Sequence, residues 1–455
     1  MQDSTFVIPI IDKWLIYSPL HHLAALLNGA AVSSLRESNS RRLPESLASI
    51  KRAIEAEPAR VPSPNSGPAR PQFVGVIPTR ACNLKCVYCG FGASSCPDRT
   101  MDLDTAVALV DWWADYAKQS GIDTLEIHFF GGEPLCAPDV VSAVVHHARR
   151  RAAEAGLAAR FEIATNGCFD DDSRAFLSDY IDSVVLSLDG KSVYQDRYRP
   201  TSSGAGTFEA VAANARRLAA SSTELCVRTC VTAENAKDLQ ESTAWMCEEL
   251  NPSSIDYEVL QPTPESDAAG LAPPDPWEFA TAFIRASRVA AEAGVRAVYS
   301  AASTDELRHS FCPVGTDTII ASPDGRLSAC YLLEEDWQSR GIDLNVGTVD
   351  AANGVKLDQS AVERVRALTG CADRCRKCFV RRHCAGGCHV NHSYPGHPDR
   401  YDDFCVQTRL IAACRLVGGL VGDEQVDRLL SDRTEMERLA LRASDTLEDW
   451  DGAAT

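Results

Sequence analysis

The chain has 455 residues and a formal net charge of −18, which argues against nucleic acid and anionic membrane surfaces as partners. Hydrophobic residues make up 45% of the chain, enough for a sizeable core in two or three domains. Its 18 cysteines occur in a long chain without a signal-peptide pattern or an uncharged apolar stretch of membrane length. We therefore expect a cytoplasmic protein whose cysteines bind metal, and neither a small disulfide scaffold nor a membrane protein.

The first 55 residues are predicted to form a small unit. Residues 6–17 have the apolar pattern of a strand, and residues 21–36 have that of a helix. The unit is either peptide-binding or a structural extension. Residues 56–71 are rich in proline and small residues, which indicates an extended linker.

Residues 72–300 alternate short apolar runs with longer amphipathic stretches. Such alternation predicts an α/β domain with a parallel sheet, although the pattern alone does not separate a partial barrel from an open doubly wound sheet. The predicted strands are residues 73–77, 125–130, 160–165, 183–188, 225–231 and 255–260. The helices expected between them include residues 104–119, 138–155 and 208–220.

Residues 301–415 are rich in cysteine, glycine, arginine and histidine and have few long periodic segments. A small irregular domain needs cross-links to be stable. In a reducing compartment we expect bound metal, and not disulfides, to provide them. Residues 416–455 are charged and are predicted to form a helical tail.

Three cysteines follow the first predicted strand. Cys82, Cys86 and Cys89 have the spacing Cys-x3-Cys-x2-Cys. Three thiolates on one loop can hold three corners of a cubane iron–sulfur cluster and leave the fourth iron open. Structural zinc usually takes four protein ligands, so zinc fits this set poorly.

This loop, with Tyr88 before its third cysteine, resembles the defining motif of radical S-adenosylmethionine (SAM) enzymes. The resemblance covers residues 73–262 and includes Phe130-Gly131-Gly132-Glu133-Pro134 at the end of the second strand. It implies a partial (β/α)6 barrel, a 4Fe–4S cluster and bound SAM. It also implies that Gly131, Gly132 and Glu133 contact the methionyl ammonium group.

Further motifs lie where later strands are predicted to end. Asn166 belongs to Ala-Thr-Asn-Gly, and Ser187 opens Ser-Leu-Asp-Gly. By resemblance, Ser187 contacts the SAM ribose and Arg199 its carboxylate, and Tyr88, Asn166 and Leu260 complete the predicted SAM contacts. The family commonly has histidine where Gln195 stands and a polar residue where Phe130 stands.

Seven cysteines near the C-terminus resemble the SPASM domain of radical SAM enzymes that modify peptides and proteins. The resemblance covers residues 311–407. A zinc ribbon is the alternative, but it does not use seven cysteines readily. The resemblance implies two auxiliary clusters, one on Cys312, Cys330 and Cys388. The other is implied on Cys375, Cys378, Cys384 and Cys405.

The first auxiliary set has only three cysteines. Its fourth iron is then open, bound by a non-cysteine ligand such as the nearby Glu306 or His309, or bound by Cys371. We expect an open site, because Cys371 lies only four residues before Cys375.

These resemblances imply three 4Fe–4S clusters and an oxidoreductase that modifies a ribosomally made peptide, installing a cross-link or another carbon-centred change. The expected partners are a precursor peptide with a leader and a reductant such as flavodoxin or ferredoxin. One alternative is a maturase of a folded protein, such as a sulfatase, forming formylglycine. Another is a non-catalytic electron-transfer protein.

Overall fold

The computed structural model describes residues 5–37, 42–91, 99–368, 373–390, 392 and 401–451. Its largest element is an eleven-stranded sheet in the order β10-β9-β8-β7-β6-β5-β4-β11-β12-β13-β14. The parallel part consists of β4 (Val74–Val76), β5 (Thr124–Phe129), β6 (Ala158–Thr165), β7 (Ser183–Ser187), β8 (Glu224–Val231), β9 (Ser254–Val259) and β10 (Arg296–Val298).

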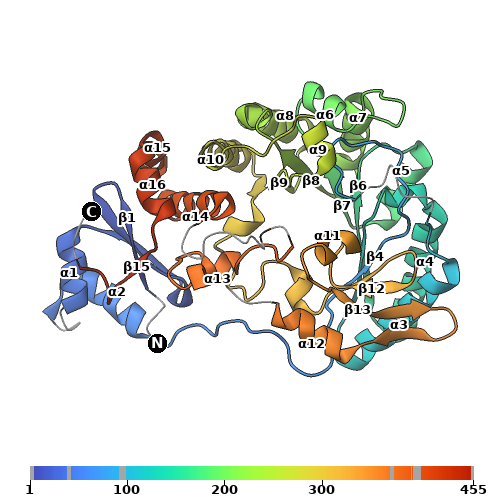
Figure 1. Ribbon diagram of the computed structural model, residues 1–455, viewed down its shortest axis with the longest axis horizontal. Coiled ribbons are helices and arrows are strands. Elements are labelled where there is room, and N and C mark those ends of the chain that lie inside the picture. Colours follow the sequence, from blue (N-terminus) through green and yellow to red (C-terminus); the bar gives the residue numbers. More distant parts are fainter. Residues whose placement is uncertain are drawn as a thin grey trace.

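The six strands predicted between residues 73 and 260 match β4 to β9, with ends that differ by at most two residues. Helices alternate with them, so the predicted parallel α/β sheet is confirmed. Figure 1 shows α3 to α8 on the outer side of the curved sheet. The helices of this part are α3 (Leu103–Ser120), α4 (Pro138–Ala155), α5 (Asp171–Tyr180), α6 (Ser192–Tyr198), α7 (Phe208–Ala219), α8 (Leu239–Leu250), α9 (Pro264–Ala268) and α10 (Pro276–Glu292).

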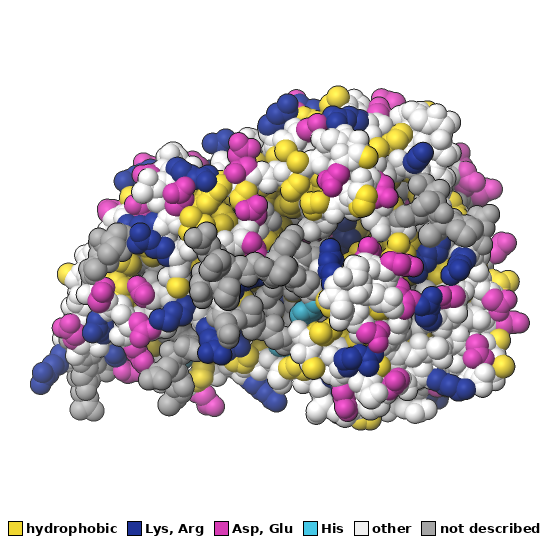
Figure 2. All heavy atoms as spheres, in the orientation of Figure 1, with side chains coloured by type: hydrophobic (Ala, Val, Ile, Leu, Met, Phe, Trp, Pro, Cys, Tyr) yellow, Lys and Arg dark blue, Asp and Glu magenta, His cyan; other side chains and the backbone are white. Residues whose placement is uncertain are grey.

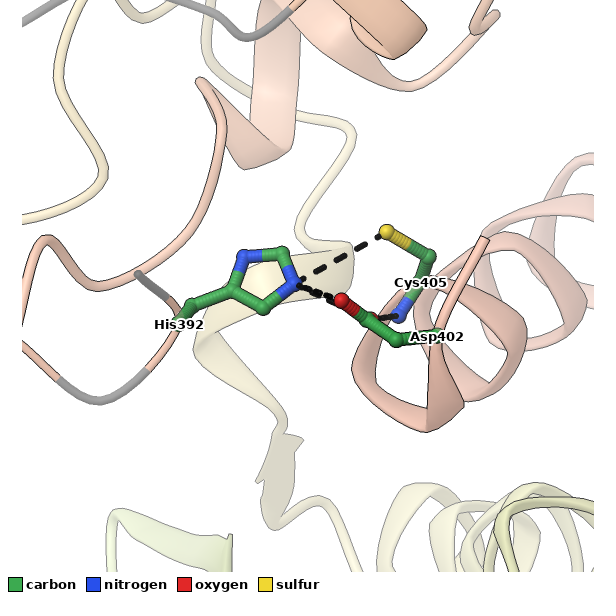
Figure 3. A group of neighbouring side chains, drawn as sticks. All are labelled: His392, Asp402 and Cys405. Atoms are coloured by element: carbon green, nitrogen blue, oxygen red, sulfur yellow. Dashed lines mark hydrogen bonds and ion pairs between the residues drawn. The ribbon is translucent and has the colours of Figure 1, made fainter. Parts of the chain in front are cut away.

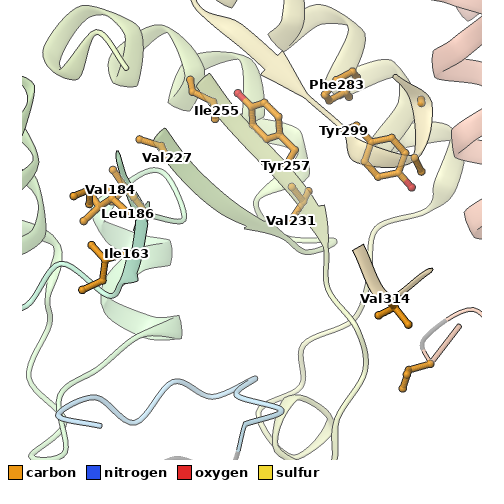
Figure 4. Close-up of a cluster of buried hydrophobic side chains, with 14 of the residues drawn as sticks. Ile163, Val184, Leu186, Val227, Val231, Ile255, Tyr257, Phe283, Tyr299 and Val314 are labelled. Atoms are coloured by element: carbon orange, nitrogen blue, oxygen red, sulfur yellow. The ribbon is translucent and has the colours of Figure 1, made fainter. Parts of the chain in front are cut away.

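Side chains on the strands alternate between the helix layer and the inner face of the sheet. In β5, Leu125, Ile127 and Phe129 are almost fully buried, whereas Glu126 and His128 between them are partly exposed. Burying each large apolar side chain stabilises the fold by about 1.5–3 kcal/mol. Figure 4 shows this apolar layer continuing across β6, β7, β8 and β9. The alternation leaves polar groups on the inner face.

The cysteine-rich region extends the same sheet. Strand β11 (Ile319–Ala321) lies parallel to β4, and β12 (Arg326–Ser328), β13 (Asn345–Asp350) and β14 (Gly354–Leu357) follow antiparallel. The region is therefore continuous with the barrel-like domain. The remaining helices are α11 (Glu334–Gln338), α12 (Gln359–Ala367), α13 (Arg381–Cys384), α14 (Asp403–Val421), α15 (Asp423–Ser431) and α16 (Arg433–Leu441).

The N-terminal unit differs from its prediction. Residues 6–17, expected as one strand, form the hairpin β1 (Phe6–Ile10) and β2 (Lys13–Ser18). Residues 21–36, expected as one helix, are divided between β3 (Leu23–Leu27) and α1 (Gly29–Glu37), followed by α2 (Glu45–Glu55). The helical pattern was misleading because β3 pairs with β2 along the whole of its own length, and such pairing overrides local propensity.

The C-terminal tail returns to the N-terminal unit. Strand β15 (Asp445–Thr446) pairs with β1, and the Trp450 ring lies 5.4 Å from that of Trp14. Figure 1 shows α1, α2, β1 and β15 together in this one region. The predicted boundary at residues 415/416 falls inside α14, which is continuous from Asp403 to Val421.

Helix α14 is the one helix among the described residues that is long and apolar enough to cross a membrane. More than half of the relevant stretch is buried inside the protein, and α14 packs on α10 and α16. It therefore has the surroundings of a core helix.

A buried ion pair fixes the predicted linker. No helix or strand occurs in the described residues 56–73. Asp317 accepts hydrogen bonds from the Arg366 guanidinium at 2.7 Å, and Arg366 also donates to the carbonyl of Gly67 at 2.7 Å. The exposed fractions of the two charged side chains are 1% and 6%. Burial raises the pKa of Asp317, but the bonds from Arg366 and Asn65 outweigh it, and the pKa is lowered.

Arg366→Leu should therefore lower the free energy of unfolding by about 3–5 kcal/mol, because it leaves a buried carboxylate without its cation. Arg364→Leu is the matched control, since Arg364 pairs with Asp343 on the surface and such pairs contribute about 0–1 kcal/mol. Urea unfolding followed by circular dichroism measures both. Equal midpoints for the two variants would contradict this role of the buried pair.

Candidate functional site

The first cysteine loop lies directly after β4. The backbone N–H of Val87 donates to the Tyr198 carbonyl at 2.9 Å, and that of Lys85 donates to the Pro200 carbonyl at 2.8 Å. These bonds hold the loop against the segment that follows α6. The loop is thereby placed at the carboxyl end of the parallel sheet, where ligand sites of parallel α/β folds lie.

The loop brings Cys82, Cys86 and Cys89 within electrostatic reach of one another. Burial raises the pKa of Cys82 to about 12 and that of Cys86 to about 11. The Arg199 guanidinium opposes this effect at Cys86. Three gathered thiols next to a cation fit a cluster held by three thiolates, so this donor set is compatible with the predicted 4Fe–4S group.

Gly131 and Gly132 are required by close packing on the cysteine loop. Gly131 has a φ of +144°, and a Cβ there would lie 2.7 Å from the Thr79 carbonyl oxygen. A Cβ on Gly132 would lie 2.1 Å from the Ala81 carbonyl oxygen. No side chain fits at that separation. The glycines therefore let the loop after β5 lie against the residues that lead into Cys82.

Glu133 is 2% exposed and connects the ends of two strands. Its carboxylate accepts hydrogen bonds from the Asn166 backbone N–H at 2.7 Å, from the Thr165 hydroxyl at 2.9 Å and from the Leu135 N–H at 3.2 Å. Burial raises the pKa of Glu133 to about 7, and these bonds partly oppose the rise. A carboxylate held in this way can offer charge to a cation at the sheet edge.

Asn166 orients the cysteine loop from β6. Its side-chain amide donates to the Asn83 side chain at 2.7 Å and lies 3.7 Å from Cys82 Sγ. Its side-chain oxygen accepts from the Cys168 N–H at 2.8 Å. Both ends of the amide are thus used, and Asn166 lies against the cysteine loop. Its predicted contact with SAM stays a prediction.

Asp189 is at the centre of the site, although sequence reasoning named it only as part of a motif. Its side chain is fully buried and accepts from Arg199 Nε at 2.9 Å, from the Tyr88 hydroxyl and from the Cys230 N–H at 2.9 Å. The Arg199 guanidinium lies 5.2 Å from the centre of the Tyr88 ring. One carboxylate therefore positions both Tyr88 and Arg199.

Gln195, where the resembling family commonly has histidine, supports the same loop. Its side-chain oxygen accepts from the Asp189 N–H at 2.9 Å, and its amide donates to the Thr207 hydroxyl at 3.3 Å. The exposed fraction of Gln195 is 0%. An amide supplies an acceptor and a donor at fixed positions, so it holds the loop here without a histidine.

The remaining predicted SAM contacts lie on the same edge. Ser187 ends β7 and is partly buried. Leu260 follows β9, is 2% exposed, and belongs to a cluster that packs against Tyr88. The structure thus gathers at one edge of the sheet the first cysteine loop and all the predicted SAM contacts. That set is Cys82, Cys86, Tyr88, Cys89, Gly131, Gly132, Glu133, Asn166, Ser187, Arg199 and Leu260.

Sequence reasoning assigned Cys230 to packing, and the structure places it in this site. Cys230 lies on the inner face at the end of β8, and its neighbours include Asp189, Arg199 and Cys86. Burial raises the pKa of this thiol well above its usual value. A period-two count from the buried Val231 could have placed Cys230 on the inner face.

The C-terminal cysteines form two groups. Cys312, Cys330 and Cys388 act electrostatically on one another. Burial raises the pKa of Cys312 to about 11 and that of Cys330 to about 12. These three thiols form the first group, which is the three-cysteine set of the first auxiliary cluster.

Cys375, Cys378 and Cys405 all lie within electrostatic reach of Tyr401. Arg409 Nη1 is 3.3 Å from Cys378 Sγ. Cys384 is buried at the end of α13. Three members of the second predicted set are therefore brought together around one aromatic ring.

Three residues are candidates for the fourth ligand of the first auxiliary cluster. Two of them make other hydrogen bonds, and the third lies outside the described residues. His309 Nε2 is 3.2 Å from the Gly315 carbonyl oxygen, and the Glu306 carboxylate accepts from Arg308 at 3.1 Å. Cys371 falls outside the described residues. The predicted open position remains a prediction.

Residues 76–246 match the model of the Radical SAM superfamily. A 134-residue stretch is 28% identical to a PqqA peptide cyclase from Methylorubrum populi, which corresponds to 29% of this chain and 32% of that protein. The match thus spans about a third of the length of this relative.

Two solved structures share the fold over most of the chain. One is native anSMEcpe with bound AdoMet, at a TM-score of 0.60 and 18% identity, covering 76% of this chain and 98% of that one. The other is Streptococcus suis SuiB bound to S-adenosylmethionine, at a TM-score of 0.54 and 14% identity, covering 89% and 99%. With the superfamily match from β4 into α8, they confirm the predicted fold class. The segment from β4 into α8 is therefore similar to the Radical SAM superfamily, and the chain has the fold of the solved radical SAM structures.

Proposed function

We propose that this protein is a cytoplasmic maturase that modifies a ribosomally made peptide. The observation that carries the proposal is the gathering of two further cysteine groups beside a radical SAM site. The matched relative is named a peptide cyclase. SuiB, which shares the fold, has also been solved bound to its precursor peptide SuiA. Both support a peptide as the substrate.

When bound, the cluster and SAM would supply the radical chemistry that removes hydrogen from an unactivated carbon of the peptide. The residues around them bind, orient and exclude water. Cys82, Cys86 and Cys89 hold the cluster. Glu133 and the backbone carbonyls of Gly131 and Gly132 would bind the ammonium of SAM, and Arg199 would bind its carboxylate. The product is a cross-link or another carbon-centred change in the peptide.

Asp189 determines which nitrogen of the Arg199 guanidinium is available to SAM. Two of the three guanidinium nitrogens of Arg199 face Asp189, at 2.9 Å and 3.4 Å. The third nitrogen is left for the SAM carboxylate. Because Arg199 is 12% exposed, its charge acts in a poorly solvated setting, where a charge-assisted hydrogen bond is stronger.

The two C-terminal groups are proposed to hold 4Fe–4S clusters that exchange electrons with the substrate or bind it. A small protein such as flavodoxin or ferredoxin is the proposed reductant. The N-terminal unit is proposed to hold the leader of the peptide, since β3 is one of the two edge strands of its sheet. An edge strand can accept a further extended segment by backbone hydrogen bonds. Its alternative role is a structural extension.

Anaerobically reconstituted protein should contain about twelve iron per chain, from three clusters of four. The triple change of Cys82, Cys86 and Cys89 to Ala should remove about a third of this iron and abolish release of 5′-deoxyadenosine from SAM under strong reduction. Cys247→Ala, a buried thiol of α8, is the control and should change neither. Equal release by all three proteins would refute the role of this loop, and zinc in the C-terminal groups would refute the auxiliary clusters.

Arg199→Gln should weaken SAM binding by about tenfold to a hundredfold, because it removes a charged hydrogen bond of about 1.5–3 kcal/mol. Arg197→Gln is a matched control from the same segment. Arg197 is half exposed and pairs with Glu234 on the surface, so SAM affinity should not change. Equilibrium dialysis of the cluster-loaded proteins measures both constants, and equal losses would contradict the assignment of Arg199.

A further inference from the structure

His392 lies between the two auxiliary cysteine groups. Its backbone N–H donates to the Cys388 carbonyl at 2.8 Å, and its side chain is 3% exposed. The ring packs on Phe404, with centroids 4.3 Å apart. A Cβ on Gly387 would lie 2.3 Å from His392 Nδ1. The glycine therefore makes room for the ring, whose orientation is fixed on several sides.

Both ring nitrogens have defined neighbours. Nδ1 is 2.7 Å from the Gly386 carbonyl oxygen, and Nε2 is 2.9 Å from the Asp402 carboxylate. Nε2 also lies 3.8 Å from Cys405 Sγ, as Figure 3 shows. A carbonyl and a carboxylate only accept hydrogen bonds. The ring thus serves as a donor at Nε2, where Asp402 is the nearer acceptor and Cys405 Sγ is a second, longer acceptor of the same N–H. Arg374 Nη2 lies 3.4 Å from the same nitrogen.

Asp402 connects this histidine to α14. Its carboxylate accepts from the Cys405 backbone N–H at 3.0 Å as the N-cap of the helix. Arg374 lies 3.3 Å from the same carboxylate and balances its charge. The cap fixes the first turn of α14 and with it the position of the Cys405 side chain. The same carboxylate fixes the ring of His392. The distance between Nε2 and the thiol is therefore set by the backbone.

His392, Asp402 and Cys405 lie close enough together to bind a single metal ion, but they do not all bind the predicted cluster. Each iron of a cubane takes one protein ligand, and Cys405 supplies it to the second auxiliary cluster. His392 and Asp402 are then outside the ligand set. An N–H that donates to a ligating sulfur withdraws electron density from it and makes reduction of the cluster easier.

We propose that His392 is a positioning residue whose Nε2–H, shared between Asp402 and Cys405 Sγ, raises the reduction potential of the second auxiliary cluster. Asp402 holds the ring for this purpose. This inference rests on the cluster assignment proposed above.

The test is an anaerobic redox titration followed by electron paramagnetic resonance, in protein whose Cys82, Cys86 and Cys89 are changed to Ala. Only the auxiliary clusters then titrate. His392→Leu should lower the midpoint potential of one of the two clusters and leave the iron content unchanged. His392→Gln keeps an N–H donor and should return the potential towards the parent value.

His147→Leu is the matched control, because His147 forms a similar pair with Asp111 at 2.8 Å, on α3 and α4 and away from the cysteine groups. Unchanged potentials in His392→Leu, or an equal shift in His147→Leu, would overturn the proposal. Loss of about four iron in His392→Leu would overturn it too, since that result makes His392 a ligand. A parent protein without about eight iron would instead refute the auxiliary clusters themselves.

Discussion

The buried carboxylate of Asp189 is the interaction on which the rest of the site depends. It lies after β7 and receives hydrogen bonds from Tyr88 in the cysteine loop, from Arg199 after α6 and from the Cys230 N–H in β8. Three segments far apart in the sequence are thereby fixed to one group. A buried carboxylate that lost its cation would cost about 3–5 kcal/mol, so the pair with Arg199 holds the geometry firmly.

The second constraint is the continuity of the sheet. Because β11 lies parallel to β4, the cysteine-rich region begins beside the strand that leads into the first cysteine loop. Phe130, next to Gly131, contacts Phe91 and Tyr331, with centroids 5.8 Å and 4.9 Å away. Tyr331 directly follows Cys330. The contacting rings of Phe91, Phe130 and Tyr331 therefore connect the first cysteine loop with the first auxiliary group by direct packing.

This packing explains why Phe130 is apolar at a position where the resembling family commonly has a polar residue. A polar residue there would face two aromatic rings, and an unpaired polar group in such surroundings costs free energy. The polar contacts that hold the loop come from Glu133, Asn166 and Gln195 instead. The site thus combines apolar packing on one side with hydrogen bonds on the other.

The sequence by itself determined the sheet and the chemistry at its edge. Strands β4 to β9 were predicted within two residues, since a period-two pattern in a buried strand is a local property. The cysteine spacings likewise predicted which loops bind metal. Local patterns failed in the N-terminal unit, where pairing of β3 with β2 overrode a helical pattern.

Only the tertiary structure decided which residues meet. Asp189 as the shared acceptor, Cys230 inside the site and His392 beside Cys405 each depend on segments brought together from different elements. The return of the C-terminal tail to β1 is of the same kind. A side chain's partners depend on packing between segments distant in sequence, and no periodicity within one segment specifies them.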